Sequence, residues 1–131
     1  MLSAVETQLI AHIITSSVQS CVFGFPLNVS TYPAAACTWR SGSVDRGAGN
    51  GAIRDLALTL EVQIDSNSAA GAVAAAEEVS RLWYDAARVA ELSALGVISI
   101  LPKAISPPTG LQQTQQIAKA LVSFDVVVRM T

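Results

Sequence analysis

Residues 56–65 read Leu-Ala-Leu-Thr-Leu-Glu-Val-Gln-Ile-Asp, and this segment indicates the fold class of the chain. Large apolar side chains alternate along it with small or polar ones, which is the two-residue period of a β-strand. Only one face of such a strand is apolar, whereas a parallel strand covered on both faces is apolar throughout. The segment therefore predicts a strand of an antiparallel or mixed sheet whose apolar face is covered by helices.

The first element of the chain is predicted to be a helix. Ser3 and Glu6 have the spacing of a capping box, in which two side chains satisfy backbone N–H groups of the first turn. Projected as a helix, the apolar side chains that follow fall on one broad face. We expect this helix to continue to about residue 20, shortly before a Gly-Phe-Pro sequence. Strands are expected after it at residues 27–31 and 34–40.

A second helix is predicted at about residues 69–89. Two further strands are predicted at residues 97–101, stopped by Pro102, and at residues 121–130, with a turn at residues 107–110 between them. The order of elements predicts an α+β fold, with two helices packed on one face of a mainly antiparallel (mixed) β-sheet. The inner face of the second helix is expected to consist of Val73, Ala76, Val79, Leu82, Trp83 and Ala86.

The segment between the strands at 34–40 and 56–65 is rich in glycine. Four of the eight glycines of the chain lie within it, among serine, asparagine and charged residues. This composition predicts that residues 40–54 form a long, mobile, glycine-rich loop of a β-hairpin. We expect its charged side chains to pair with a neighbouring subunit or a partner protein, and a solvated tip without such a role is the alternative. The candidate interface residues are Trp39, Arg40, Asp45, Arg46, Arg54 and Asp55.

The composition indicates one domain that associates with itself. The 131 residues fit a single α+β domain, residues 1–131, and 51% of them are hydrophobic against 14% that are charged. A chain of this length leaves about a third of its unfolded surface exposed after folding. An unusually apolar chain is therefore expected to cover part of that surface at a subunit interface. The net charge of −2, without a basic run, disfavours tight binding to nucleic-acid phosphates.

Residues 7–39 contain no Asp, Glu, Lys or Arg, yet they do not predict a transmembrane helix. Polar side chains, glycine and proline interrupt the segment too often for about 20 residues that cross hydrocarbon. No basic segment of a secretory signal precedes it, so neither a membrane location nor secretion is expected. Cys21 and Cys37 are expected to be reduced, buried thiols, although their spacing also permits a disulfide.

No group of residues has the spacing of a catalytic or metal site. His12 is the only histidine, and it falls on the polar stripe of the first predicted helix, where a surface or interface position is expected. Neither cysteine has a CxxC partner, and the glycines of the loop match neither phosphate-binding fingerprint. The adjacent carboxylates Glu77 and Glu78 point about 100° apart on a helix. We therefore expect no enzymatic activity, no catalytic residue, no cofactor and no metal.

Several segments together resemble the tail-terminator (tail-completion) proteins of long-tailed bacteriophages and related contractile particles. The resemblance is architectural and covers most of the chain. Its carriers are the opening helix at 5–11, Tyr32-Pro33-Ala34-Ala35-Ala36 before a strand, the long loop, the strand at 56–65, the helix that contains 76–83, and a closing strand ending in Val126-Val127-Val128-Arg129.

This resemblance implies a structural protein of the virion, in the tail or neck, that is assembled in the host cytoplasm. It implies a homohexameric ring that caps the head-proximal end of the tail tube, ends tube polymerisation and joins the tail to the neck. The implied partners are other copies of the chain, the tail-tube protein and the neck or connector protein, with DNA only in transit through the lumen and no membrane.

Other functions stay open beside this one. Another neck, head–tail connector or tail-tube subunit has a similar size and layout. A small ligand-binding or regulatory domain is an alternative from a different class, and a deep pocket containing Arg40, Asp45 or Arg54 would be typical of it.

Overall fold

The computed structural model describes residues 2–24, 31–46, 54–107 and 117–130. The five strands of this part form one sheet in the order β1-β2-β3-β5-β4. β1 runs parallel to β2, and the other neighbouring strands are antiparallel. The predicted α+β fold with a mixed sheet is confirmed. The elements are α1 (Leu2–Ile13), β1 (Ser20–Phe23), β2 (Ala34–Arg46), β3 (Arg54–Ser66), α2 (Ala69–Ser80), the 3-10 helix η1 (Leu82–Tyr84), α3 (Ala86–Ser93), β4 (Val97–Ser106) and β5 (Ala118–Met130).

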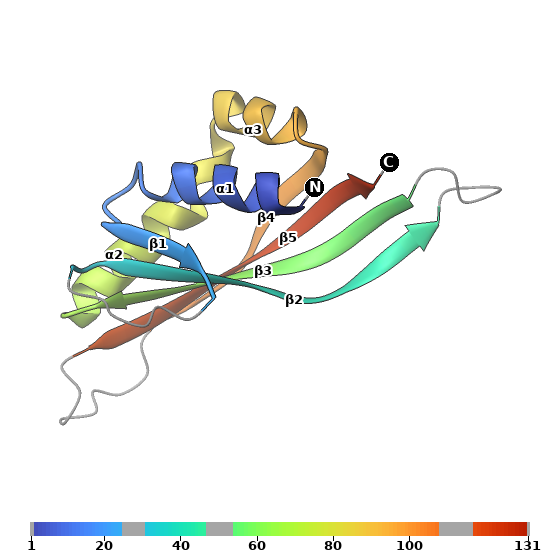
Figure 1. Ribbon diagram of the computed structural model, residues 1–131. Helices are drawn as coiled ribbons and strands as arrows, with labels where there is room; N and C mark the ends of the chain where they lie inside the picture. The colour runs from blue at the N-terminus through green and yellow to red at the C-terminus, as the bar shows by residue number, and fades with distance from the viewer. Residues whose placement is uncertain (1, 25–30, 47–53, 108–116, 131) are drawn as a thin grey trace.

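The helices form a layer on one face of the sheet (Figure 1). Buried side chains of α1 and α2 belong to the same cluster as those of β3 and β5, so both helices cover the same face of the sheet. We call this the inner face and the opposite one the outer face. β2, β3 and β5 are the longest strands, and their ends at one edge of the molecule run beyond the helices (Figure 1).

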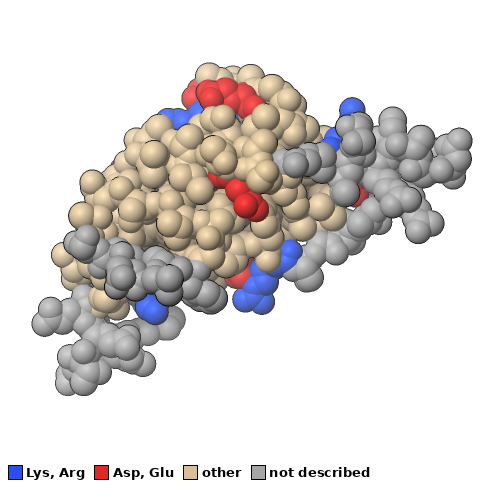
Figure 2. Space-filling model, viewed as in Figure 1, with Lys and Arg blue, Asp and Glu red and all other residues tan. Residues whose placement is uncertain are grey.

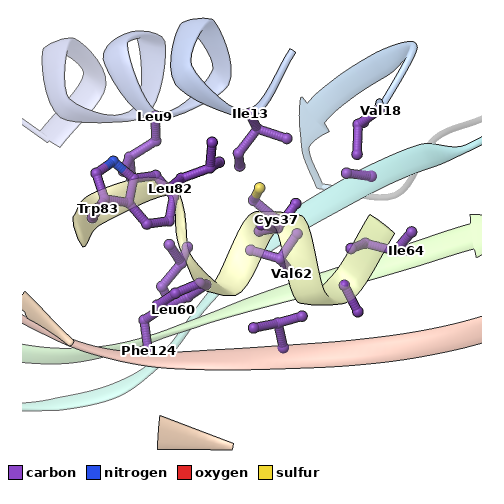
Figure 3. Close-up of a cluster of buried hydrophobic side chains, with 14 of the residues drawn as sticks. Leu9, Ile13, Val18, Cys37, Leu60, Val62, Ile64, Leu82, Trp83 and Phe124 are labelled. Atoms are coloured by element: carbon purple, nitrogen blue, oxygen red, sulfur yellow. The ribbon is translucent and has the colours of Figure 1, made fainter. Parts of the chain in front are cut away.

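The inner face of β3 is the apolar face that the sequence predicts. Leu60, Val62 and Ile64 are fully buried (Figure 3). Because directly paired residues share a face, the register identifies the inner residues of the neighbouring strands as well. Opposite the three β3 side chains lie Trp39, Cys37 and Ala35 on β2, and Phe124, Val122 and Ala120 on β5.

The first helix is shorter than predicted, because α1 ends at Ile13 instead of about residue 20. The hydroxyl groups of Thr15 and Ser16 donate to the carbonyl oxygens of His12 and Ile13, each at 2.6 Å. Side-chain hydrogen bonds of this kind compete with continuation of a helix and give the chain a turn. The turn directs Val18 into the core and lets β1 form beside β2, which the helical pattern did not anticipate.

The predicted helix at 69–89 is also interrupted. α2 begins at a cap in which Ser68 Oγ accepts from the backbone N–H of Gly71 at 3.0 Å, and it ends at Ser80. η1 follows, and α3 then begins where the carboxylate of Asp85 accepts from the backbone N–H of Ala87. The break changes the inner face, since the buried α2 side chains are Ala72, Ala75, Ala76 and Val79, while Val73 is only half-buried and Ala86 is exposed.

β4 continues through Pro102 to Ser106, although the proline was expected to stop it. The strand lies at the edge of the sheet, where a missing N–H donor removes no bond that the sheet requires. Its register with β5 shifts next to this proline, between Pro102 and Ala104. β5 begins three residues earlier than predicted, at Ala118.

Some predictions fall outside the described residues. The strand at 27–31 and the turn at 107–110 lie mostly there. The glycine-rich loop does so in part, since residues 41–46 and 54 belong to β2 and β3 and residues 47–53 are outside. Within the described part, no helix is both long enough and apolar enough to cross a membrane.

Candidate interaction surface

The outer face of the sheet is the broad surface that the helices leave uncovered (Figure 1). Apart from the buried Ala34 and Ala36 of β2, its side chains are half-buried or exposed, and several are small or carry a hydroxyl group. A sheet face of this kind offers a broad area to another protein. Its half-buried or exposed residues include Thr38 and Arg40 of β2, Ala57, Thr59, Glu61 and Gln63 of β3, Leu121, Ser123, Asp125 and Val127 of β5, and Leu101 of β4.

Charges of both signs are balanced on the outer face. Arg40 contacts Glu61, Lys103 Nζ lies 3.9 Å from Asp125, and Arg129 Nε lies 4.0 Å from Asp55. Lys119 and Asp65 occupy paired positions of β5 and β3. Three positive side chains therefore lie within 4.0 Å of negative ones, a fourth pair shares a register position, and pairs that are largely exposed contribute little to stability. The described charges of the outer face do not form the row of basic side chains that would bind a nucleic-acid phosphate backbone.

Exposed apolar side chains gather on the open edge strand β4. Leu101 is 60% exposed, Ile98 45% and Ile105 41%. We call these three residues the β4 edge. Open edges invite pairing with another chain, and Pro102, Lys103 and the register shift limit such pairing here. The β4 edge has exposed apolar side chains on both faces of the sheet, because Leu101 pairs with Asp125 of the outer face and Ile105 pairs with Val122 of the inner face. Water solvates such side chains poorly, and a partner surface would cover them.

Charged side chains are sparse on the side of the molecule where β1 and β2 face the viewer. Figure 2 shows this side as mostly uncharged, with acidic and basic side chains in a few small groups. The 14% of charged residues is too small a share to cover the surface of the chain. An extended charged patch is therefore not a feature of this side.

Trp39 does not lie on the outer face with the charged residues proposed beside it. It faces the helices, donates from Nε1 to Glu6 Oε2 at 2.9 Å, and its ring lies 5.7 Å from that of Phe23. These contacts tie β2 to α1 and to β1. In the described chain Trp39 is a packing residue, half-buried at the margin of the core.

The remaining candidate interface residues lie along the hairpin of β2 and β3. Arg40 is exposed on the outer face, and Asp55 lies near Arg129 with its Oδ1 atom closed to solvent and without a hydrogen bond from the described residues. Asp45 pairs with Asp55, and Arg46 pairs with Arg54, in the backbone register. The side chains of Asp45, Arg46 and Arg54 lie outside the described part of the structure.

His12 is buried, and the prediction of a surface or interface position was wrong. Its Nδ1 accepts from Trp83 Nε1 at 3.0 Å, and its Nε2 lies 3.0 Å from Gln8 Nε2 and 3.5 Å from Glu91 Oε2. A neutral ring that accepts at Nδ1 carries its proton on Nε2. The helical pattern could not reveal this position, because the break after α2 brings Trp83 and Glu91 over the polar stripe of α1.

Two of the hollows in the described part involve the helices and the start of β4. The larger, of about 440 Å³, lies where α1, α2 and α3 meet. Its polar groups bond one another: Arg88 donates to Thr15 Oγ1 and to the Leu82 carbonyl, and the Ser17 N–H donates to Glu78 at 2.7 Å. The smaller, of about 310 Å³, is lined by Ser93, Gly96, Val97, Ile98 and Arg129.

The described residues hold no cluster of three or more histidine, cysteine, aspartate or glutamate side chains that could bind a metal.

The β4 edge was missed by sequence reasoning. Residues 97–101 form an apolar run, which is typical of a buried strand, and only the position of β4 at the end of the sheet exposes part of it.

Comparison with known proteins adds no identification. No protein-family model matches the chain, and no curated protein matches it significantly.

Proposed function

We propose that the protein is a structural subunit of a long-tailed bacteriophage, a tail terminator that forms a hexameric ring at the head-proximal end of the tail tube. In this role it ends polymerisation of the tube, joins the tail to the neck or connector, and belongs to the virion after assembly in the host cytoplasm. It acts without catalysis and without a cofactor.

The observation that carries the proposal is the exposed apolar β4 edge at the margin of the outer face, whose described charges are balanced. Covering Ile98, Leu101 and Ile105 would contribute on the order of 1 kcal/mol for each side chain. Apolar side chains bordered by a surface of mixed polar and apolar residues are the usual composition of a protein–protein interface. Assembly would therefore bury apolar side chains that an isolated subunit leaves exposed to water.

The hairpin of β2 and β3 supports the same proposal. Its strands run past the helices, so they extend the sheet beyond the compact part of the subunit (Figure 1). Extended hairpins reach neighbouring subunits without displacing the core of either one. Arg40 and Asp55 lie on the described strands of this hairpin and would meet a neighbouring subunit or the tube.

The charge of the chain is compatible with a ring around DNA. The net charge is −2, and the described side chains of the outer face include as many negative as positive ones. DNA passes through such a lumen without the counterion release that makes binding tight. The proposal therefore includes DNA in transit and excludes a stable complex with it.

Averaged images of the assembled particle, with the chain labelled, test the position of the subunit along the tail and the symmetry of the ring. We expect six copies around the axis at the head-proximal end of the tube. A single copy that lies off the axis would contradict the ring.

Two matched variants test the surface. Leu101→Lys charges the β4 edge, and Tyr84→Lys charges a side chain that is 71% exposed in η1, away from that edge. Incorporation into particles should fall at least tenfold for Leu101→Lys and remain near wild type for Tyr84→Lys, with both melting temperatures unchanged. Equal incorporation of the two variants would remove the β4 edge from the interface.

A further inference from the structure

Two thiols from neighbouring strands meet at the inner face, near the edge strand β1. Cys21 Sγ lies 3.6 Å from Cys37 Sγ. Cys37 is fully buried and its sulfur points toward α1, whereas Cys21 is only partly buried (Figure 3). The two residues are offset along the parallel pair, since Cys21 is opposite Ala35 and Cys37 is opposite Phe23. Both side chains therefore lean toward each other across the strands.

The surroundings of the two thiols make them chemically unequal. The hydrogen bond with Cys37 lowers the pKa of Cys21, against a smaller opposing effect of burial. The same hydrogen bond raises the pKa of Cys37, and burial and the charges of Cys21 and Glu6 raise it further. Since the thiolate is the nucleophile in exchange reactions, Cys21 is the more reactive and also the more accessible group.

We propose that Cys21 and Cys37 form a redox-active pair that closes to an intrachain disulfide on reaction with a small-molecule disulfide of the glutathione type. In the first step the Cys21 thiolate attacks one sulfur of the small disulfide. A bond forms between Cys21 Sγ and that sulfur, the original sulfur–sulfur bond breaks, and one small thiol leaves with the proton of Cys21.

The second step uses the buried thiol. Once Cys21 is in a mixed disulfide it carries no negative charge and no longer accepts the thiol hydrogen of Cys37, so two of the causes that raise the pKa of Cys37 are removed. The Cys37 thiolate then attacks Cys21 Sγ and releases a second small thiol. Two protein thiols are oxidised in total, and one small disulfide is reduced to two thiols.

Closure requires only a local movement. A disulfide bond is about 2.0 Å long, so the sulfurs must approach by roughly 1.5 Å from their present separation. β1 has four residues and pairs with β2 alone, so it can shift without disturbing the central strands. The bond would tie β1, and through it the end of α1, to the main sheet.

The inference goes beyond the proposed function and does not depend on it. Inside a reducing cytoplasm the pair stays open, and in an oxidising environment outside a cell it closes. A particle protein would pass from one environment to the other after release, but the chemistry belongs to this pair of residues in any setting.

Incubation of the folded, full-length chain with oxidised glutathione tests the proposal. Intact mass should show a product two hydrogen atoms lighter than the reduced chain, without a retained glutathione. A titration of free thiols in the denatured product should show that neither cysteine is still reduced. Chymotrypsin cuts after Phe23, between the two cysteines. The peptide with Cys21 and the peptide with Cys37 should stay joined by the disulfide until a reductant is added. The melting temperature of the oxidised chain should rise by several degrees, because a loop of moderate length is closed.

Two variants test the order of the steps. Cys37→Ala should accumulate a stable glutathione adduct on Cys21, and Cys21→Ala should react at least tenfold more slowly than wild type, since only the buried thiol remains. Both substitutions replace a small side chain by a slightly smaller one and should leave the fold intact by circular dichroism. A wild-type chain that retains the adduct, forms only intermolecular disulfides or keeps both thiols would overturn the proposal.

Discussion

Leu60 is the position at which the assignment of the two sheet faces can be tested most directly. Its side chain has no exposed surface and lies between the paired positions of Trp39 and Phe124. The next residue along the strand, Thr59, points to the outer face and is half-buried. Asparagine can be placed at either position, so that the same polar side chain enters opposite environments one residue apart.

The expected cost of Leu60→Asn has two parts. Loss of the buried leucine removes about 2 kcal/mol of hydrophobic stabilisation. The amide, enclosed without hydrogen-bond partners, adds about 2 kcal/mol more. The sum of about 4 kcal/mol is a large share of the 5 to 15 kcal/mol that stabilises a typical domain. Thr59→Asn should cost less than about 1 kcal/mol, since the outer face leaves its amide in contact with water.

Urea denaturation followed by tryptophan fluorescence measures both changes. With a denaturant slope of about 2 kcal/mol per molar, the midpoint of Leu60→Asn should fall by about 2 M, and that of Thr59→Asn by less than about 0.5 M. Midpoints for the two variants that agree within about 0.5 M would refute the assignment of the inner face.

Two further predictions concern interactions within the helical layer. His12→Phe should destabilise the chain by about 1 to 3 kcal/mol, because the buried N–H of Trp83 loses its acceptor. The cost should be about 1 kcal/mol smaller in a Trp83→Phe background, and a double-mutant cycle of urea midpoints measures the difference. Additive costs of the two substitutions would contradict the hydrogen bond. Ser68→Ala should cost about 1 kcal/mol through loss of the α2 cap, while Asn67→Ala, at the exposed preceding position, should cost nearly nothing. Thermal melts by circular dichroism compare these two variants, and equal melting temperatures would mean that Ser68 does not cap the helix.

The strands β3 and β5 and their buried face could be predicted well from local sequence. The alternation at 56–65 and at 121–130 depends on which way successive side chains point, which is a property of the strand itself. Leu60, Val62 and Phe124 are accordingly buried as their pattern indicates. The α+β class follows from the same period, because a one-sided strand requires a layer of helices on its apolar face.

The helix ends and the break between α2 and α3 were not predictable from periodicity. An apolar stripe continues across positions where the backbone turns, so it does not show where a helix stops. Thr15, Ser16 and Asp85 end or begin helices through hydrogen bonds whose geometry exists only in the folded chain. The burial of His12 was not predicted for the same reason, since its hydrogen-bond partner Trp83 is 71 residues away in sequence.

The candidate surface depends most on tertiary structure. Trp39 and Arg40 are adjacent in the sequence, yet they point to opposite faces of β2, and only the register with β3 shows which face each one takes. The apolar run of β4 reads as a buried strand until the strand order places it at the edge. Strand order arises from hydrogen bonds between segments far apart in the chain, such as β3 with β5, and no local pattern of side chains encodes it.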